Sequence, residues 1–254
     1  VTETDIENSD ATVRARVIPL QTWLDDVEVS AGTLILIRDL TELRDRDRQL
    51  VTKDATIREI HHRVKNNLQT VAALLRLQSR RMSNSDAKDA LKQAMGRVSA
   101  IAVVHEILSQ NFEEQVAFDE VADRILHMVG DVAASSGSVV ARREGSFGEV
   151  PAETATALSL ATTELCQNAI EHSLDSSSGN VIVRPHRTDD ALVVDIVSDG
   201  KPLPEGFSLD NHRSSLGLSI VTTLMQDLGG TFTLEDNSDR VGTCARLVIP
   251  LQRL

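Results

Sequence analysis

The stretch EIHHRVKNNLQ, residues 59–69, places two histidines side by side, followed by basic residues and two asparagines. Histidine side chains bind metal ions, carry protons and act as nucleophiles. Neighbouring positions on a helix differ by about 100°, so the rings of His61 and His62 point apart. They cannot chelate one metal ion together, as a pair spaced i, i+4 could. The pattern therefore indicates that one histidine does chemistry while the other packs.

A long helical repeat distinguishes the two histidines. From residue 40 to residue 82 mostly apolar positions recur in alternating steps of three and four, which predicts a long helix with one apolar stripe. His61 falls on this stripe, whereas His62 falls one position beside it and is open to solvent. A phosphate acceptor must be reachable by a second domain, which favours His62. Arg63 and Lys65 would help to neutralise an incoming triphosphate.

A second helix follows a short turn, MSNSD, with Ser85 or Asp86 as the expected cap. Its apolar positions also step by three and four, from residue 87 to residue 112, and they include His105. Two such helices predict an antiparallel hairpin. Two hairpins make a four-helix bundle, so we expect a homodimer with twofold symmetry. His105 is predicted to be buried and hydrogen-bonded, with coupling to the histidine site as the alternative.

The second half of the chain mixes helical and strand patterns. Helices are predicted at 117–134, 151–174 and 216–228, strands at 138–147, 180–187 and 191–198, a loop at 199–215 and a final hairpin at 230–251. This order predicts an α+β sandwich, with helices on one side of a mixed sheet.

The string His62-Arg63-Val64-Lys65-Asn66-Asn67-Leu68 lies over the phosphoacceptor box of sensor histidine kinases without a gap. It resembles the HHRVKNNLQ subtype of their dimerisation domain. The resemblance implies that His62 is the phosphoacceptor, in agreement with the heptad position. In the commoner kinases an acidic residue follows this histidine and is thought to act as the base, but here Arg63 follows. Glu59, one turn earlier, or a carboxylate of the nucleotide domain is then the candidate base.

Residues 164–172, ELCQNAIEH, resemble the N box of the GHKL-type ATP-binding domain shared by Hsp90, gyrase and histidine kinases. The resemblance implies that the Asn168 carboxamide helps to hold Mg²⁺, that Glu164 orients water or acts as base, and that His172 lies at the nucleotide. Mg²⁺ takes oxygen ligands, many of them from phosphates and water, which one Asn oxygen beside a triphosphate fits. Taken alone, Glu and Asn four residues apart would be a surface pair.

The segment IVSDGKPLPEG, residues 196–206, resembles the first glycine box of the same domain, with a departure. Ser198 stands where the family has the Asp that binds the adenine amino group, and Pro202 stands at the second Gly. Either Asp199, one residue later, takes that role, or the adenine contact is weak or missing.

The segment SLGLSIV, residues 215–221, resembles the second glycine box, whose N–H groups at a helix start can cradle phosphates. Gly242-Thr243 resembles the last box, with a simple hairpin turn as the alternative. The loop 200–214 would be the lid over ATP. The glycine boxes together imply the nucleotide-binding residues Asp199, Gly200, Leu216, Gly217, Leu218, Gly242 and Thr243.

The N-terminal segment reads as two strands, 11–20 and 31–39. The string LILIRDLTEL resembles the last strand of a PAS sensor domain, whose D-x-T motif leads into a signalling helix. We therefore expect three parts. They are a C-terminal PAS remnant at 1–40, a signalling helix and dimerisation hairpin at 41–115, and an ATP-binding catalytic domain at 116–254. The first residue is not Met, which suggests a fragment of something longer.

Composition excludes some partners. A net charge of −12, with 2% aromatic residues and no Tyr, argues against nucleic-acid binding. No apolar run approaches the ~20 residues of a membrane span, and the acidic N-terminus is unlike a signal peptide. Cys166 and Cys244 lack metal-type spacing and are expected to be reduced core residues of a cytoplasmic protein.

The resemblance implies a cytoplasmic, dimeric sensor histidine kinase. ATP with Mg²⁺ would phosphorylate His62, and the phosphoryl group would pass to an Asp of a response-regulator receiver. Within the subtype the resemblance is closest to actinobacterial sensors whose partner regulator carries an RNA-binding antiterminator module. One alternative is a dimeric signalling scaffold with a degenerate nucleotide pocket, motivated by Ser198 and Pro202. Another is a serine kinase of the anti-sigma type, which would not use the histidine helix.

Overall fold

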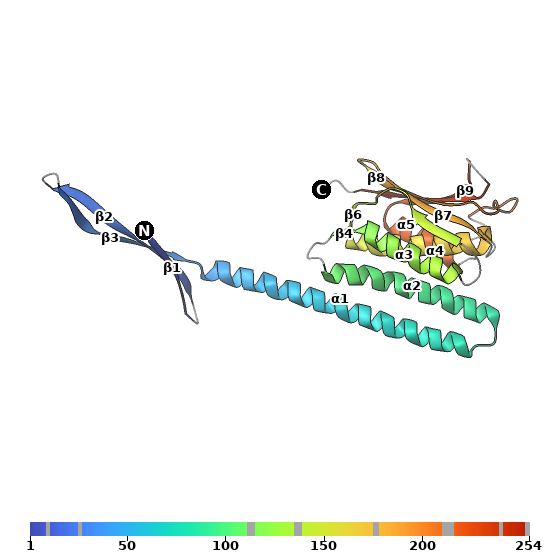
Figure 1. Cartoon of the computed structure of the whole chain (residues 1–254), viewed down its shortest axis with the longest axis horizontal. Helices are drawn as coiled ribbons and strands as arrows, with labels where there is room; N and C mark the ends of the chain where they lie inside the picture. Colours follow the sequence, from blue (N-terminus) through green and yellow to red (C-terminus); the bar gives the residue numbers. More distant parts are fainter. Residues whose placement is uncertain are drawn as a thin grey trace. The chain divides into compact units, whose positions relative to one another are not determined.

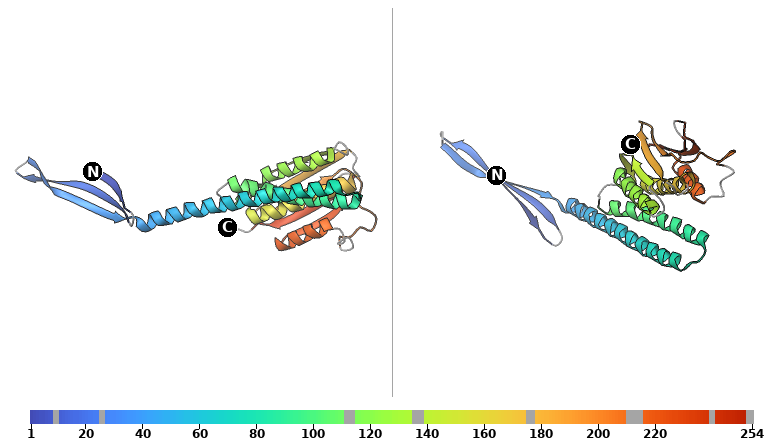
Figure 2. Two further views of the ribbon diagram at one scale, coloured as in Figure 1. Left: turned by 90° about the horizontal axis from the view of Figure 1, so that it is seen from below. Right: turned by 45° about the vertical axis from the view of Figure 1, so that its right-hand side comes forward.

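The computed structural model describes residues 1–8, 11–24, 27–110, 115–134, 139–174, 178–209, 216–238 and 241–251. The chain forms two compact units, residues 1–57 and 58–254. The elements of each unit are drawn in Figures 1 and 2.

The first unit contains a three-stranded antiparallel sheet of β1 (Thr2–Glu7), β2 (Thr12–Leu24) and β3 (Val27–Asp39), in that order. Both predicted strands are present but longer, and β1 was not predicted. The sequence placed the start of the second strand beside Gly32, whereas β3 begins at Val27 and continues through this residue. A register shift of the β2–β3 ladder lies opposite it, and Gly32 has a φ of 138°. A strand can pass such a bulge without ending.

The D-x-T junction is a helix start. Asp39 Oδ1 accepts hydrogen bonds from the Thr41 backbone N–H (2.9 Å) and hydroxyl (2.6 Å), at the start of α1 (Thr41–Arg81). These hydrogen bonds lower the pKa of Asp39. The carboxylate thereby satisfies a backbone donor that a helix start leaves unpaired. The PAS resemblance of this unit stays a prediction.

The hairpin of α1 and α2 (Ser85–Gln110) matches the two heptad patterns. Its turn differs from the prediction. The cap of α2 is Asn84, whose Oδ1 accepts from the backbone N–H groups of Asp86 (2.8 Å) and Ala87 (3.3 Å), and not Ser85 or Asp86. All three residue types are good caps, so composition alone could not separate them.

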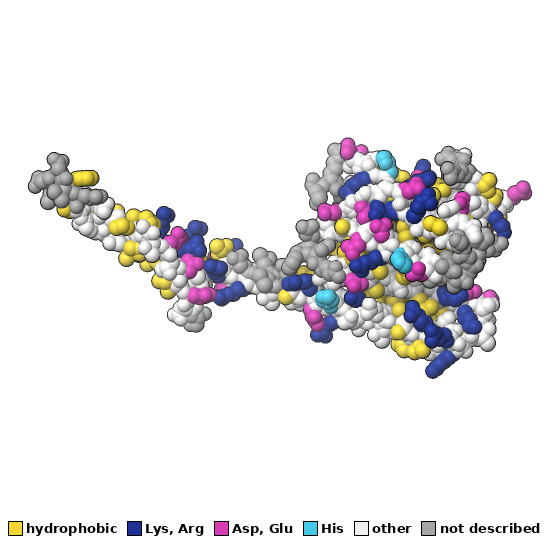
Figure 3. Space-filling model, viewed as in Figure 1, with side chains coloured by type: hydrophobic (Ala, Val, Ile, Leu, Met, Phe, Trp, Pro, Cys, Tyr) yellow, Lys and Arg dark blue, Asp and Glu magenta, His cyan; other side chains and the backbone are white. Residues whose placement is uncertain are grey.

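Helix α1 buries only part of its apolar surface within this chain. Val64, Leu68 and Leu75 on the predicted stripe are half-buried. Val71 of the same stripe is exposed, as are Ile60, Leu74 and Leu77 beside it. Figure 3 shows apolar side chains gathered on the surface of the hairpin.

The C-terminal part is an α/β sandwich, as predicted. Its main sheet has the order β5-β7-β8-β10-β9, with β5 and β7 parallel and the other pairs antiparallel. The elements are β4 (Gln115–Ala117), α3 (Phe118–Ala134), β5 (Val139–Arg143), β6 (Glu149–Pro151), α4 (Ala152–Asn168), η1 (Ala169–Ser173), β7 (Gly179–Arg187), β8 (Ala191–Ser198), α5 (Leu216–Asp227), β9 (Thr231–Asp236) and β10 (Thr243–Pro250). Helices α3, α4 and α5 cover one face of this sheet (Figures 1 and 2). The small β4–β6 pair was not predicted.

Helix α4 is the centre of the core. Strand β8 alternates buried and half-buried side chains, and its buried Leu192, Val194 and Ile196 belong to the same apolar cluster as Leu158 and Leu165 of α4. The other side of α4 meets α2 (Figure 1). A helix enclosed on two sides has little solvent-facing surface, which explains why the charged Glu164 is buried. No helix within the described ranges has the length and apolarity needed to cross a membrane.

Candidate nucleotide site and phosphoacceptor helix

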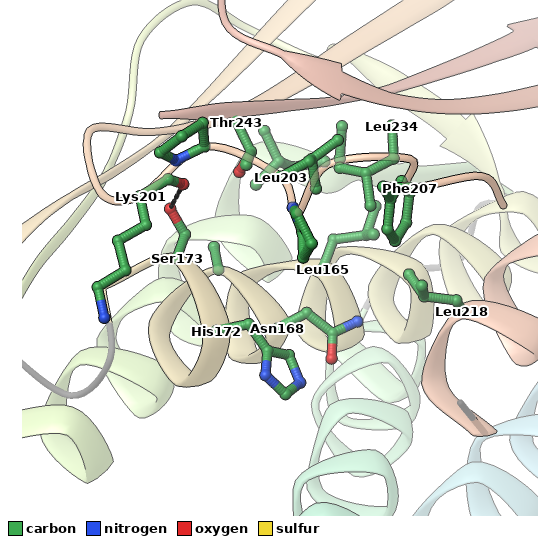
Figure 4. A pocket seen from close by; sticks show the side chains of 15 residues that line it. Leu165, Asn168, His172, Ser173, Lys201, Leu203, Phe207, Leu218, Leu234 and Thr243 are labelled. Carbon is green, nitrogen blue, oxygen red and sulfur yellow. Dashed lines mark hydrogen bonds between the residues drawn. The ribbon is translucent and has the colours of Figure 1, made fainter. Parts of the chain in front are cut away.

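A cavity of about 490 Å³ lies between α4, η1, the loop after β8 and the start of α5. Figure 4 shows side chains of all these segments around it. Leu165, Ile196 and Ala245 give it apolar walls, while Asn168 and Lys201 supply polar groups. An apolar cavity of this size with a few polar groups is typical of a small-molecule site.

Several residues expected at a nucleotide line this cavity. Asn168, His172, Leu218 and Thr243 lie around it and come from four separate segments. The other predicted residues do not line it: Asp199, Gly200, Leu216, Gly217 and Gly242. Leu216 is 63% exposed.

The glycines of the boxes bring main chains together near the cavity. A Cβ at Gly200 would overlap the carbonyl group of Ser173, and a Cβ at Gly242 would overlap the carbonyl group of Ser198. Gly242 also has a φ of 134°, which side chains rarely tolerate. Both positions therefore require glycine for close approach.

The Asn168 amide fits a role in ligand binding. Its buried Nδ2 atom has no hydrogen-bond partner within the described part of the chain. Buried polar atoms are normally paired, so one at a cavity indicates a ligand or solvent partner. The two ends of an Asn amide are exchangeable, and either can face the cavity. These features fit a nucleotide with a hard cation at Asn168.

The first glycine box is arranged differently from its resemblance. Asp199 accepts hydrogen bonds from the backbone N–H (2.7 Å) and Nδ2 (2.6 Å) of Asn180 on β7. Ser198 is buried, and its hydroxyl lies 2.7 Å from Ser173 Oγ and 2.8 Å from Thr243 Oγ1. Of the two alternatives left by the sequence, this geometry favours a weak or missing adenine contact, because Asp199 is bound to Asn180 and does not line the cavity. Ser173 and Lys201 also line the cavity and were not predicted.

The first acid of the N box makes a contact that the sequence did not indicate. Glu164 is 3% exposed, and both of its carboxylate oxygens accept hydrogen bonds from Arg97 on α2. Arg97 Nε lies 2.7 Å from Oε1 and its Nη2 lies 2.9 Å from Oε2. The hydrogen bond to Glu164 raises the pKa of Arg97 above its usual value. Nothing in the pattern of α2 distinguishes Arg97 from its other basic residues.

The two histidines differ as the heptad position predicted. His62 is exposed, whereas His61 is half-buried with its Nδ1 2.9 Å from Nδ1 of His105 on α2. His105 is thus hydrogen-bonded, as expected, but half-buried where the sequence predicted burial. Glu59 forms an ion pair with Arg63, one turn further along α1. Arg63 Nε lies 2.7 Å from Glu59 Oε1, and both side chains are exposed.

The His61–His105 pair predicts a pH-dependent stability. Burial lowers the pKa of both rings, helped by the charge of His62 on His61 and of His61 on His105. Below an ordinary pKa near 6.5 the unfolded chain binds protons that the folded hairpin does not. Folding stability is therefore present above that pH and is lost as the pH falls toward the depressed values. We expect the thermal midpoint to fall between pH 7.5 and 5.5, and to fall less in His105→Gln. An equal fall in both proteins would contradict this assignment.

The geometry defines a helical hairpin with an exposed histidine, followed by an α/β sandwich with a nucleotide-sized cavity. A family model described as "Histidine kinase" matches residues 59–133, and one described as "Histidine kinase-, DNA gyrase B-, and HSP90-like ATPase" matches residues 153–253. The chain therefore carries a histidine kinase region and a histidine kinase-type ATPase domain. A helical kinase region followed by a GHKL-type ATPase domain is the predicted order.

The comparisons include curated relatives that are sensor histidine kinases. The chain is 48% identical over 252 residues to the sensor histidine kinase PdtaS of Mycobacterium tuberculosis and 45% identical to that of Mycolicibacterium smegmatis. Each match covers 98% of this chain and 49% of the relative, so the chain spans about half the length of these relatives. Among solved structures, the histidine kinase domain of a blue-light-activated histidine kinase from Erythrobacter litoralis is 26% identical, with a TM-score of 0.55. That match covers 82% of this chain and 94% of the other.

Proposed function

We propose that this chain is the kinase core of a two-component sensor. It binds ATP in the cavity beside α4 and transfers the γ-phosphoryl group to His62, from which the group passes to an Asp of a response-regulator receiver. The observation that carries the proposal is that Asn168, His172, Leu218 and Thr243 meet at one cavity, in a chain whose exposed His62 lies on a separate helix.

Different parts of the cavity wall would bind different parts of the nucleotide. The apolar walls of Leu165, Ile196 and Ala245 suit a purine base, and the N–H groups at the start of α5 suit phosphates. Asn168 would hold Mg²⁺ through its amide oxygen, and the ion would neutralise phosphate charge. Lys201 adds a positive charge at the cavity.

The transfer needs a nucleophile and a base. A ring nitrogen of neutral His62 attacks the γ-phosphorus while the bond to the β–γ bridging oxygen breaks and ADP leaves. The other ring nitrogen must then give its proton to a base. Glu59 is paired with Arg63, and Glu164 is paired with Arg97. Glu59 is exposed and uses only Oε1 for Arg63, whereas Glu164 is 3% exposed and has to become accessible before it can accept that proton.

The proposed protein partners are a second copy of this chain and a response regulator. The exposed apolar side chains along α1 support a homodimer through the hairpin. The likeness to sensor histidine kinases supports a response-regulator receiver as the phosphoryl acceptor. The proposal also includes an RNA-binding antiterminator as the output module of that regulator. Both cysteines are free, and burial raises the pKa of the Cys166 thiol to about 12, so that thiol is unreactive. These thiols fit a cytoplasmic location.

Incubation with γ-labelled ATP and Mg²⁺ tests the proposal. An acid-labile, base-stable label on the protein supports a phosphohistidine. An acid-stable label would instead favour a serine kinase. The scaffold with a degenerate pocket remains the second candidate, because Ser198 and Pro202 depart from the family pattern. An absence of nucleotide binding at millimolar ATP would favour that scaffold.

The hydroxyl cluster of Ser198, Ser173 and Thr243 predicts a gain of ATP affinity in Ser198→Asp. A carboxylate there would accept a hydrogen bond from the adenine amino group, and bonds to charged groups contribute about 1.5–3 kcal/mol. We expect about tenfold tighter ATP binding, with a larger preference for ATP over GTP, measured by calorimetry. Asp199→Asn serves as the control and is expected to leave affinity unchanged, because Asp199 binds Asn180. The assignment is wrong if Asp199→Asn weakens ATP binding and Ser198→Asp has no effect.

A further inference from the structure

Helix α2 packs on the face of α4 that carries the N box. Glu164, Gln167 and Glu171 of α4 and η1 recur at steps of three and four, so they share one face. Each has a partner on α2: Arg97 binds Glu164, the backbone of Gly96 lies against Gln167, and Gln93 binds Glu171. We call these three pairs the α2–α4 contact.

The three pairs differ in strength. The Gln93–Glu171 hydrogen bond is 3.2 Å long and exposed. Gly96 permits close packing, because a Cβ there would lie 2.5 Å from Gln167 Nε2. The Arg97–Glu164 pair has two charge-assisted hydrogen bonds, with side chains 17% and 3% exposed. Paired, buried and bidentate groups make strong contacts, so this ion pair dominates.

We propose that the Arg97–Glu164 pair holds the kinase in a resting state, by clamping the ATP-binding domain to α2 and occupying the N-box carboxylate. The inference rests on the proposed function, since a resting state presupposes phosphoryl transfer. In the clamped state Glu164 is 3% exposed and Arg97 holds both of its oxygens, so the carboxylate is not accessible to His62. When α2 separates from α4, the Glu164 carboxylate becomes accessible and the ATP-binding domain can move.

The clamp behaves as a two-state element. Removing Arg97 leaves the Glu164 carboxylate buried without a counter-charge, which disfavours the clamped state. The released state exposes Glu164 to water and carries no such penalty. Loss of Arg97 therefore shifts the population toward release, and this separates a clamp from a residue that merely supports the fold.

The test compares Arg97→Ala, Arg97→Lys and Lys92→Ala in the full 254-residue chain. Lys92 is the matched control, because it is exposed on the same helix and pairs with Asp89. We expect Arg97→Ala to raise the autophosphorylation rate about fivefold or more, the lower end of measured coupling between sites. Nucleotide affinity should stay within about twofold, since Arg97 does not line the cavity. Arg97→Lys keeps the charge but loses the second hydrogen bond, so its autophosphorylation rate should lie between those of Arg97→Ala and the unaltered chain. Lys92→Ala should have the rate of the unaltered chain.

A second readout reports the clamp without kinase activity. With Gln93→Cys and Glu171→Cys introduced together, a disulfide should form in the clamped state, stop phosphorylation when oxidised, and restore it when reduced. Adding Arg97→Ala should slow disulfide formation about fivefold or more. A slower kinase in Arg97→Ala, or unchanged cross-linking, would overturn the clamp. If the unaltered chain does not phosphorylate itself at all, the proposed function fails, while the cross-linking rates still decide whether Arg97 holds α2 to α4.

Discussion

Replacing His62 with glutamine is expected to reduce phosphoryl labelling to the level of a blank without protein. The imidazole supplies the nucleophilic nitrogen, and an amide nitrogen has no lone pair available for attack. His62 is exposed on α1 and lies outside the cavity, so the substitution should leave folding and ATP affinity unchanged. Acid-labile label from γ-labelled ATP and the thermal midpoint are measured side by side.

His61→Gln is the matched control for the acceptor. It removes the neighbouring ring and the 2.9 Å contact with His105, but it keeps His62. We expect label to persist in this variant with a lower thermal midpoint. The opposite result, with label retained in His62→Gln and lost in His61→Gln, would show that the acceptor is the ring on the apolar stripe.

Periodicity was enough to predict most of the fold. Apolar steps of three and four predicted α1 and α2, because a helix must bury one stripe. The strand pattern at residues 191–198 predicted β8, whose burial alternates along its whole length. The mixed sheet with helices on one side followed from the order of these patterns. The family models, which match residues 59–133 and 153–253, confirm a histidine kinase region followed by an ATPase domain.

Features that depend on a single turn or on tertiary contact were not predictable. The sequence predicted one helix at 151–174, but α4 ends at Asn168 and one π turn, η1, follows. Ser173, at the end of that turn, bonds to Ser198 from β8. Likewise, the ion pair of Arg97 with Glu164 joins residues far apart in sequence, and no periodicity indicates it. Several residues that line the cavity were predictable from the sequence. The residues that pair with the charged groups near it were not.

Gly217→Val is expected to abolish most nucleotide binding. Gly217 lies at the start of α5, where a Cβ would be 2.7 Å from Glu164 Oε2 and 3.5 Å from Asn168 Nδ2. Glu164 cannot move aside easily, because Arg97 holds both of its oxygens. The start of α5 must then move away from α4, which separates the helix N–H groups from Asn168. Overpacking of this kind costs about 1–3 kcal/mol, which corresponds to about 5- to 150-fold in affinity.

The matched control for Gly217 is Gly130 on α3, since a Cβ there would meet no atom within 4 Å. Gly130→Ala is expected to keep full ATP affinity and to raise stability by about 0.5–1 kcal/mol, because alanine loses less conformational entropy in a helix. Gly217→Ala should fall between Gly217→Val and the unaltered chain in ATP affinity, measured by calorimetry with Mg²⁺. If Gly217→Val binds ATP as tightly as Gly130→Ala does, the start of α5 is not part of the nucleotide site, and the phosphates must be held elsewhere on the cavity wall.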